Sequence, residues 1–131
     1  MTSGTRALLT GWLDVMKMPE PEEVVVAEDV SAGKPAPDCY LLGMERLGLG
    51  DPGKVLVVED STSGILAGKA AGCKVLAVVT THRVEQLLDA GADWVVQDLT
   101  HLHVADQSRA AADLAMMAPV LLRISHALSP A

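Results

Sequence analysis

Ten residues in the middle of the chain, Val55 to Gly64 (VLVVEDSTSG), constrain the fold more than any other stretch. They begin with four apolar, mostly β-branched residues, which is typical of a buried strand. Glu59 and Asp60 follow at once, and a polar turn then leads into an alanine-rich helix that we expect to end at Gly72. This order predicts an α/β unit with both carboxylates at the carboxyl edge of a sheet, where ligands bind in such folds.

The two adjacent carboxylates allow two interpretations. Glu59 and Asp60 repel each other at such an edge, and a hard cation with oxygen ligands would neutralise them. Alternatively, they only begin a loop and cap the following helix, as acidic residues often do. This stretch alone leaves both interpretations open.

The rest of the chain alternates between strand and helix patterns. We expect strands at Val24 to Ala27, Val75 to Val79 and Trp94 to Val96, and helices at Thr5 to Met18, Asp38 to Leu47, Val84 to Ala90, Gln107 to Met117 and Val120 to Leu128. Such alternation predicts an α/β protein with a Rossmann-like, three-layer, mainly parallel sheet and helices on both faces. The valine-rich strands fit burial on both sides.

Composition limits the partners and the setting. The 131 residues suit one domain or part of a larger one, and a formal net charge of −7 argues against nucleic acid or an anionic membrane as the main partner. Cys39 and Cys73 form no CxxC pair, and we find no signal peptide or spanning segment, so we expect a reducing, cytoplasmic setting. His101 and His103 lack a third ligand and are more typical of a surface than of a metal site.

Two further segments carry candidate chemistry. Thr2, Ser3 and Gly4 directly precede the first helix, where free backbone N–H groups can form a small anion site, although an ordinary Ser/Thr N-cap explains the pattern as well. Lys34 lies in a Gly-Lys-Pro loop, and Pro35 restricts its backbone to an extended conformation. A lysine on a stiffened loop can be aimed at a ligand, whereas most lysines are simply solvated.

Together these segments resemble the haloacid dehalogenase-like hydrolase superfamily. The likeness runs from Thr2 to about residue 98, through TSGTR, AGKPAP and VVEDSTSG followed by GKAAGC. It is closest to sugar- and polyol-phosphate phosphatases such as the glycerol-3-phosphate and 2-deoxyglucose-6-phosphate enzymes. Residues 99–131 fall outside the likeness, and there we expect a carboxyl-terminal helical segment.

The resemblance implies a role for each matched residue. Thr2, Ser3 and Gly4 would hold the transferring phosphoryl group, and Lys34 would stabilise its oxygens and the charge of the nucleophile. Asp60 would bind Mg²⁺, and Glu59 would support or share that role. The substrate implied is a small phosphorylated metabolite, which family members attack with an aspartate to form an aspartyl-phosphate.

The departure from the family pattern is large. No DxD occurs in the sequence, so the nucleophile, the acid/base aspartate and one principal Mg²⁺ ligand have no counterpart. The nucleophile strand and the substrate-selecting cap domain lack a counterpart as well. We therefore expect an incomplete sheet, weak Mg²⁺ binding, no activity of these residues alone and self-association through the open sheet.

Two other classes of protein were weighed. The first is a non-catalytic binding or interaction module that keeps a vestigial phosphate and metal site. The second is a receiver domain, because VLVVEDS resembles the opening of one. A receiver needs a lysine after a later strand, and no lysine follows Lys74, so this interpretation fails.

Overall fold

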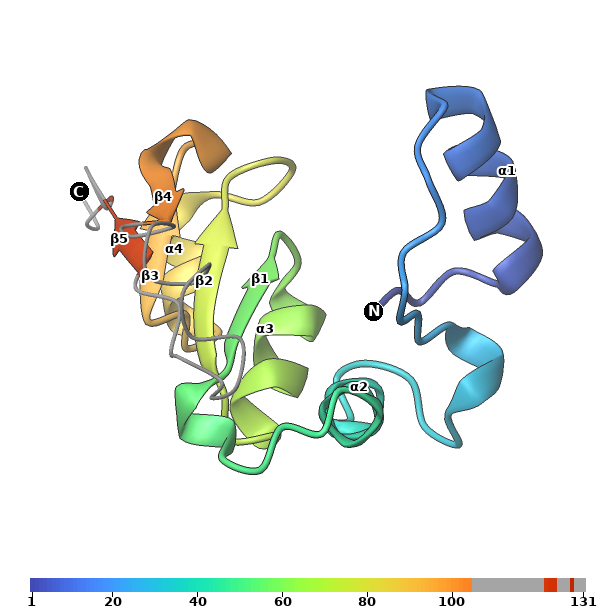
Figure 1. Ribbon diagram of the computed structural model, residues 1–131. Helices are drawn as coiled ribbons and strands as arrows, with labels where there is room; N and C mark the ends of the chain where they lie inside the picture. Colours follow the sequence, from blue (N-terminus) through green and yellow to red (C-terminus); the bar gives the residue numbers. More distant parts are fainter. Residues whose placement is uncertain (105–121, 125–127, 129–131) are drawn as a thin grey trace, which may run out of the picture.

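The computed structural model of the protein describes residues 1–104, 122–124 and 128 (Figure 1). Its central element is a parallel sheet in the order β1–β2–β3, with β1 at Leu56–Glu59, β2 at Lys74–Val78 and β3 at Trp94–Val96. The register aligns Val57 with Val75 and Ala77 with Val95. The three strands follow one another in the sheet as they do in the sequence, which confirms the expected parallel α/β fold in an incomplete Rossmann-like form.

Two helices pack against this sheet and against each other. Helix α3 (Thr62–Ala70) contacts β1 and β2, and α4 (Val84–Asp89) contacts β3. Because successive β-α-β crossovers have the same hand, both helices cover the same face. Gly68 allows α3 to approach the strands closely, since a Cβ there would lie 3.0 Å from Cγ2 of Val75.

The core between sheet and helices is aliphatic. Its fully buried members include Ile65 of α3, Val75 of β2, Leu87 of α4 and Val95 of β3. With no Phe in the sequence, β-branched strands against alanine and glycine on α3 supply the packing. Each buried Val, Leu or Ile contributes about 1.5–3 kcal/mol relative to its exposed state.

The amino-terminal part of the chain lies on the β1 side of the sheet (Figure 1). Helix α1 (Arg6–Met16) buries no residue, and α2 (Asp38–Arg46) contacts α3. Single-turn 3-10 helices occur at Ala27–Asp29 (η1), Pro52–Lys54 (η2) and Leu99–His101 (η3). Within the described residues, no helix is long and apolar enough to cross a membrane.

The expected strand at Val24 to Ala27 is wrong. Val25 and Val26 are buried, but their backbone groups bond to residues outside any strand: Val25 O accepts from Thr2 N, and Val26 N donates to the Asp29 carboxylate. Residues Ala27–Asp29 then form η1. The β-branched composition gave the burial correctly, but no neighbouring strand pairs with this segment in the described part of the chain.

The carboxyl-terminal segment also departs from expectation. Leu102–Val104 and Leu122–Ile124 form the antiparallel strands β4 and β5, so a helix continuing through Val120 to Leu128 is wrong at β5. Short apolar runs do not distinguish helix from strand by periodicity alone. The expected helix at Gln107 to Met117 lies outside the described residues.

Candidate functional site

The centre of the candidate site is a buried ion pair at the carboxyl end of β1. Glu59 is the last residue of β1, and Lys34 reaches it from the Gly-Lys-Pro loop, whose Lys34–Pro35 peptide bond is cis. Lys34 Nζ donates to Glu59 Oε1, and the two side chains are only 9% and 8% exposed. A lysine from one loop is therefore fixed beside the carboxylate of a strand 25 residues later.

Glu59 accepts hydrogen bonds on both carboxylate oxygens. Tyr40 Oη donates to Oε1 over 2.7 Å, beside the bond from Lys34. The backbone N–H groups of Asp60 and Ser61 and the Ser61 hydroxyl donate to Oε2 over 3.1, 3.2 and 3.0 Å. Tyr40 also places its ring 5.2 Å from Lys34 Nζ, within the range of a cation–π contact.

These donors control the ionisation of Glu59. Burial alone would raise its pKa, but the hydrogen bonds from Lys34 and Tyr40, with the nearby lysine charge, lower the pKa to about 2. Burial and the hydrogen bond to Glu59 raise the pKa of Tyr40 well above its usual value. At neutral pH Glu59 is therefore a carboxylate and Tyr40 a neutral phenol.

The start of α3 is shaped to receive the Glu59 carboxylate. A Cβ on Gly64 would lie 2.1 Å from the Glu59 carboxyl carbon, so only glycine leaves room there. The helix is capped by Ser61, whose hydroxyl accepts from Gly64 N over 3.1 Å. The alternative in which Glu59 and Asp60 cap this helix is therefore wrong, because Ser61 takes that role.

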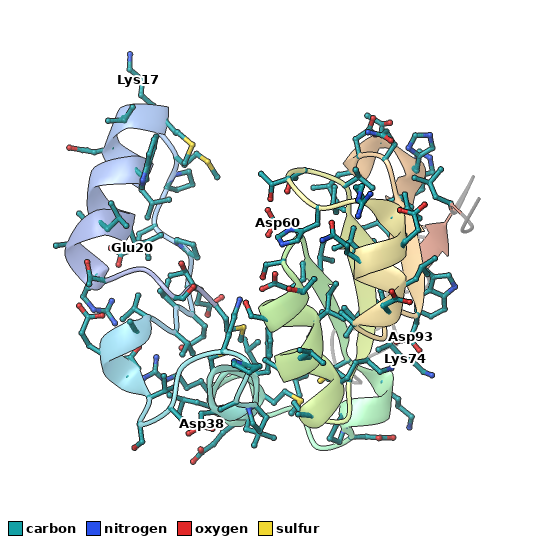
Figure 2. All side chains as sticks on the ribbon, turned by 180° about the vertical axis from the view of Figure 1, so that it is seen from behind. Lys17, Glu20, Asp38, Asp60, Lys74 and Asp93 are labelled. Atoms are coloured by element: carbon teal, nitrogen blue, oxygen red, sulfur yellow. The ribbon has the colours of Figure 1, made fainter. Side chains whose placement is uncertain are left out.

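Asp60 differs from its neighbour in both exposure and partners. Its side chain is exposed, and Oδ2 accepts from the Thr80 hydroxyl over 2.9 Å. In the part of the chain that the structure describes, no cationic side chain pairs with Asp60. Figure 2 shows Asp60 at the end of the sheet opposite to Lys74 and Asp93.

Thr2, Ser3 and Gly4 form a separate turn. Thr2 Oγ1 accepts from Gly4 N over 3.0 Å, and the turn bonds to the Val25–Ala27 segment through Thr2 N and Gly4 O. Thr5 is the N-cap of α1, accepting from Leu8 N. Among the described residues this turn makes no hydrogen bond to Lys34 or Asp60, so the phosphate-binding role of Thr2, Ser3 and Gly4 stays a prediction.

The donor set fits part of a magnesium site. Mg²⁺ in proteins is commonly bound by one or two carboxylates together with water and phosphate oxygens. Asp60 offers an exposed carboxylate oxygen, whereas both oxygens of Glu59 already accept hydrogen bonds. Within residues 1–104, no group of three or more His, Cys, Asp or Glu side chains is placed to hold a metal. Asp60 could therefore contribute to such a site, with further ligands coming from elsewhere.

A groove lies beside β1 and shares Tyr40 with the site. Its volume is about 300 Å³, and mostly apolar side chains line it, from Met1, from α2 and its C-terminal turn, and from β1. Among the described residues, β1 pairs only with β2, and Val58 is 45% exposed although it lies within the strand. In the part of the chain that the structure describes, the β1 edge next to the site therefore has no strand partner.

Sequence reasoning missed Tyr40 and Thr80. Tyr40 is the only tyrosine in the sequence, but nothing in its helical pattern indicates that its hydroxyl reaches Glu59. Thr80 carried a usable signal, because it follows the expected strand Val75 to Val79, and a polar residue there lies at the same sheet edge as Asp60.

Comparison with known proteins gives consistent matches. Residues 1–78 match a sequence family described as haloacid dehalogenase-like hydrolase. Glycerol-1-phosphate phosphohydrolase 1 of Saccharomyces cerevisiae is 41% identical over 111 residues, which cover 80% of this chain and 44% of that enzyme. Hexitol phosphatase A of Escherichia coli is 40% identical over 107 residues, which cover 82% of this chain and 48% of the relative.

Solved structures of similar proteins belong to the same family of hydrolases. A hydrolase of this type from Deinococcus radiodurans, crystallised with bound phosphate and sodium, superposes with a TM-score of 0.69 at 28% identity, over 75% of this chain and 46% of that one. The chain thus spans about half the length of the relatives that it matches.

Proposed function

The chain belongs to the haloacid dehalogenase-like hydrolases, and on that premise we propose that it forms the phosphate- and metal-holding part of a phosphatase for small sugar or polyol phosphates. The observation that carries this proposal is the Lys34–Glu59 ion pair beside the exposed Asp60. Several of the relatives are phosphatases by name, including those for glycerol 1-phosphate, hexitol phosphate and 2-deoxyglucose 6-phosphate.

The fixed lysine has a clear chemical use. An ammonium group has three donors, and Glu59 takes one of them, which leaves donors for phosphoryl oxygens. Because Lys34 is held by a buried partner, its charge needs little reorganisation when negative charge develops on a transferring group. Bound Mg²⁺ would supply further positive charge, and Asp60 is the residue that we propose to hold it.

The remaining machinery must come from outside these 131 residues. The sequence contains no DxD, so we propose that the attacking aspartate lies on another segment or chain. The open edge of β1 and the groove beside it support this view, since a neighbouring strand there would bring its carboxyl end next to Lys34. A non-catalytic binding module with the same site is the alternative.

Turnover and binding test the proposal separately. With glycerol phosphate and Mg²⁺, we expect no hydrolysis above background by this chain, and no change in Asp60→Asn. In an NMR titration with the same ligands, the amide signals of Lys34 and Ser61 should shift, and Asp60→Asn should abolish the Mg²⁺ effect. Asp51→Asn, which changes an exposed carboxylate in a remote turn, is the matched control. Hydrolysis that depends on Asp60, or equal shifts in both variants, would contradict the proposal.

A further inference from the structure

Thr80 lies in the loop that follows β2, at the same sheet edge as Asp60. Its hydroxyl donates to Asp60 Oδ2 over 2.9 Å. The loop is anchored directly before Thr80, because Val79 N donates to Val96 O over 3.0 Å. The donor therefore projects from backbone that β3 holds in place, although the Thr80 side chain itself is exposed.

Asp60 is held from a second direction by Glu59. Its backbone N–H donates to Glu59 Oε2 over 3.1 Å, and Glu59 is itself fixed by Lys34 and Tyr40. The backbone of Asp60 is thus tied to the buried ion pair, whereas Thr80 is the one described side chain that forms a hydrogen bond with its carboxylate. With Oδ2 engaged by Thr80, Oδ1 has no protein partner in the described part of the chain.

We infer that Thr80 is a positioning residue that orients the Asp60 carboxylate and presents its free oxygen to a divalent cation. This inference rests on the metal-binding role proposed for Asp60. A ligand on a flexible, exposed side chain loses rotamer entropy when it binds, and a hydrogen bond that fixes its orientation beforehand reduces that cost. Removing such outer partners typically weakens metal binding by 10–100-fold.

The neighbouring residue provides a matched control. Thr81 is also an exposed threonine of this loop, but its hydroxyl contacts the His82 ring over 3.2 Å and not Asp60. Thr80→Val and Thr81→Val therefore make the same chemical change one position apart. Thr80→Ser keeps the hydroxyl, so it should restore whatever Thr80→Val loses.

The experiment uses Mn²⁺ as the probe and NMR as the readout. Paramagnetic broadening of the Ser61 amide signal reports cation binding at Asp60, and the three-bond couplings of Asp60 report its χ1 rotamers without metal. We expect Thr80→Val to weaken Mn²⁺ binding about tenfold and to average the Asp60 rotamers. Thr81→Val and Thr80→Ser should match the parent chain in both measurements. Unchanged amide shifts in β1 and β2 verify that each variant is folded.

Two results would overturn the inference, and each rejects a different part of it. Equal Mn²⁺ affinity and equal rotamers in Thr80→Val and Thr81→Val would reject the role of Thr80 while leaving the role of Asp60 intact. Absence of Asp60-dependent broadening in the parent chain would reject the proposed metal role of Asp60, and the inference would fail with it. If Thr80→Val does not fold, Thr80→Ala provides the same comparison.

Discussion

At the scale of single residues, the surroundings of two adjacent carboxylates give them different roles. Glu59 and Asp60 are equivalent in a sequence pattern, and both were expected to serve a metal. In the structure Glu59 is buried and accepts from Lys34 and Tyr40, whereas Asp60 is exposed and accepts from Thr80. The environment that separates them comes from two distant regions of the chain, residues 34–40 and the loop at Thr80, so the pattern alone could not assign the roles.

Removing the lysine partner should be costly. We expect Lys34→Met to destabilise the fold by about 3–5 kcal/mol, because it leaves Glu59 buried and unpaired. Lys54→Met is the control, since the Lys54–Asp51 pair lies on the surface and should contribute at most about 1 kcal/mol. Urea unfolding followed by circular dichroism measures both. Similar losses in the two variants would show that the buried pair has no special role.

The same carboxylate makes stability depend on acid. The folded-state pKa of Glu59, about 2, lies below its ordinary value of 4.5. A lowered pKa contributes stability that is complete above the ordinary value and is lost as the pH falls toward the folded-state value. Urea midpoints should therefore fall between about pH 5 and pH 2. Glu59→Gln should flatten that decline, and a slope identical to that of the parent chain would contradict the assignment.

At the scale of elements, sequence patterns located most of the sheet and helices. Strand β3 and the start of α4 were placed correctly, and the positive φ values at Gly72 and Gly91 fit the expected ends of the two helices. The segment around Val25 was misassigned because strand formation needs a partner, and its backbone bonds to residues outside any strand instead. Strand β5 was missed because a short apolar run is ambiguous until its pairing with β4 is known.

The first turn of α3 gives a prediction at this scale. Gly64→Ala should displace the Glu59 carboxylate, because the new Cβ would overlap it. We expect a loss of about 1–3 kcal/mol and a shift of the Lys34 and Tyr40 signals. Gly11→Ala in the middle of α1 is the control, since nothing lies within 4 Å of that position. It should stabilise the chain by up to about 1 kcal/mol, and thermal unfolding measures both.

At the scale of the whole molecule, two apolar surfaces of the described residues matter for association. One is the open edge of β1 with its groove, where Val58 is exposed. The other is α1, where Leu8, Trp12 and Val15 are more than half exposed. Apolar strand edges and helix faces of this kind favour association, and we expect this chain to self-associate through the β1 edge.

Two charge substitutions distinguish the faces. We expect Val58→Lys to shift the chain toward the monomer in sedimentation velocity, because a lysine on an edge strand opposes pairing. Val15→Lys places the same charge on α1 and should leave the association largely unchanged. If Val15→Lys disrupted the association and Val58→Lys did not, the interface would lie on α1 instead. A parent chain that is monomeric would contradict the prediction.

The two ends of β1 carry different residues, and this difference has a practical consequence. Lys54 lies just before the amino end of this strand and its side chain is 82% exposed, whereas Lys34, Glu59 and Asp60 gather at the other end. Both native cysteines are buried. A single thiol introduced as Lys54→Cys should therefore react selectively, and a chain immobilised through it would present the Asp60 end of the sheet to the solution.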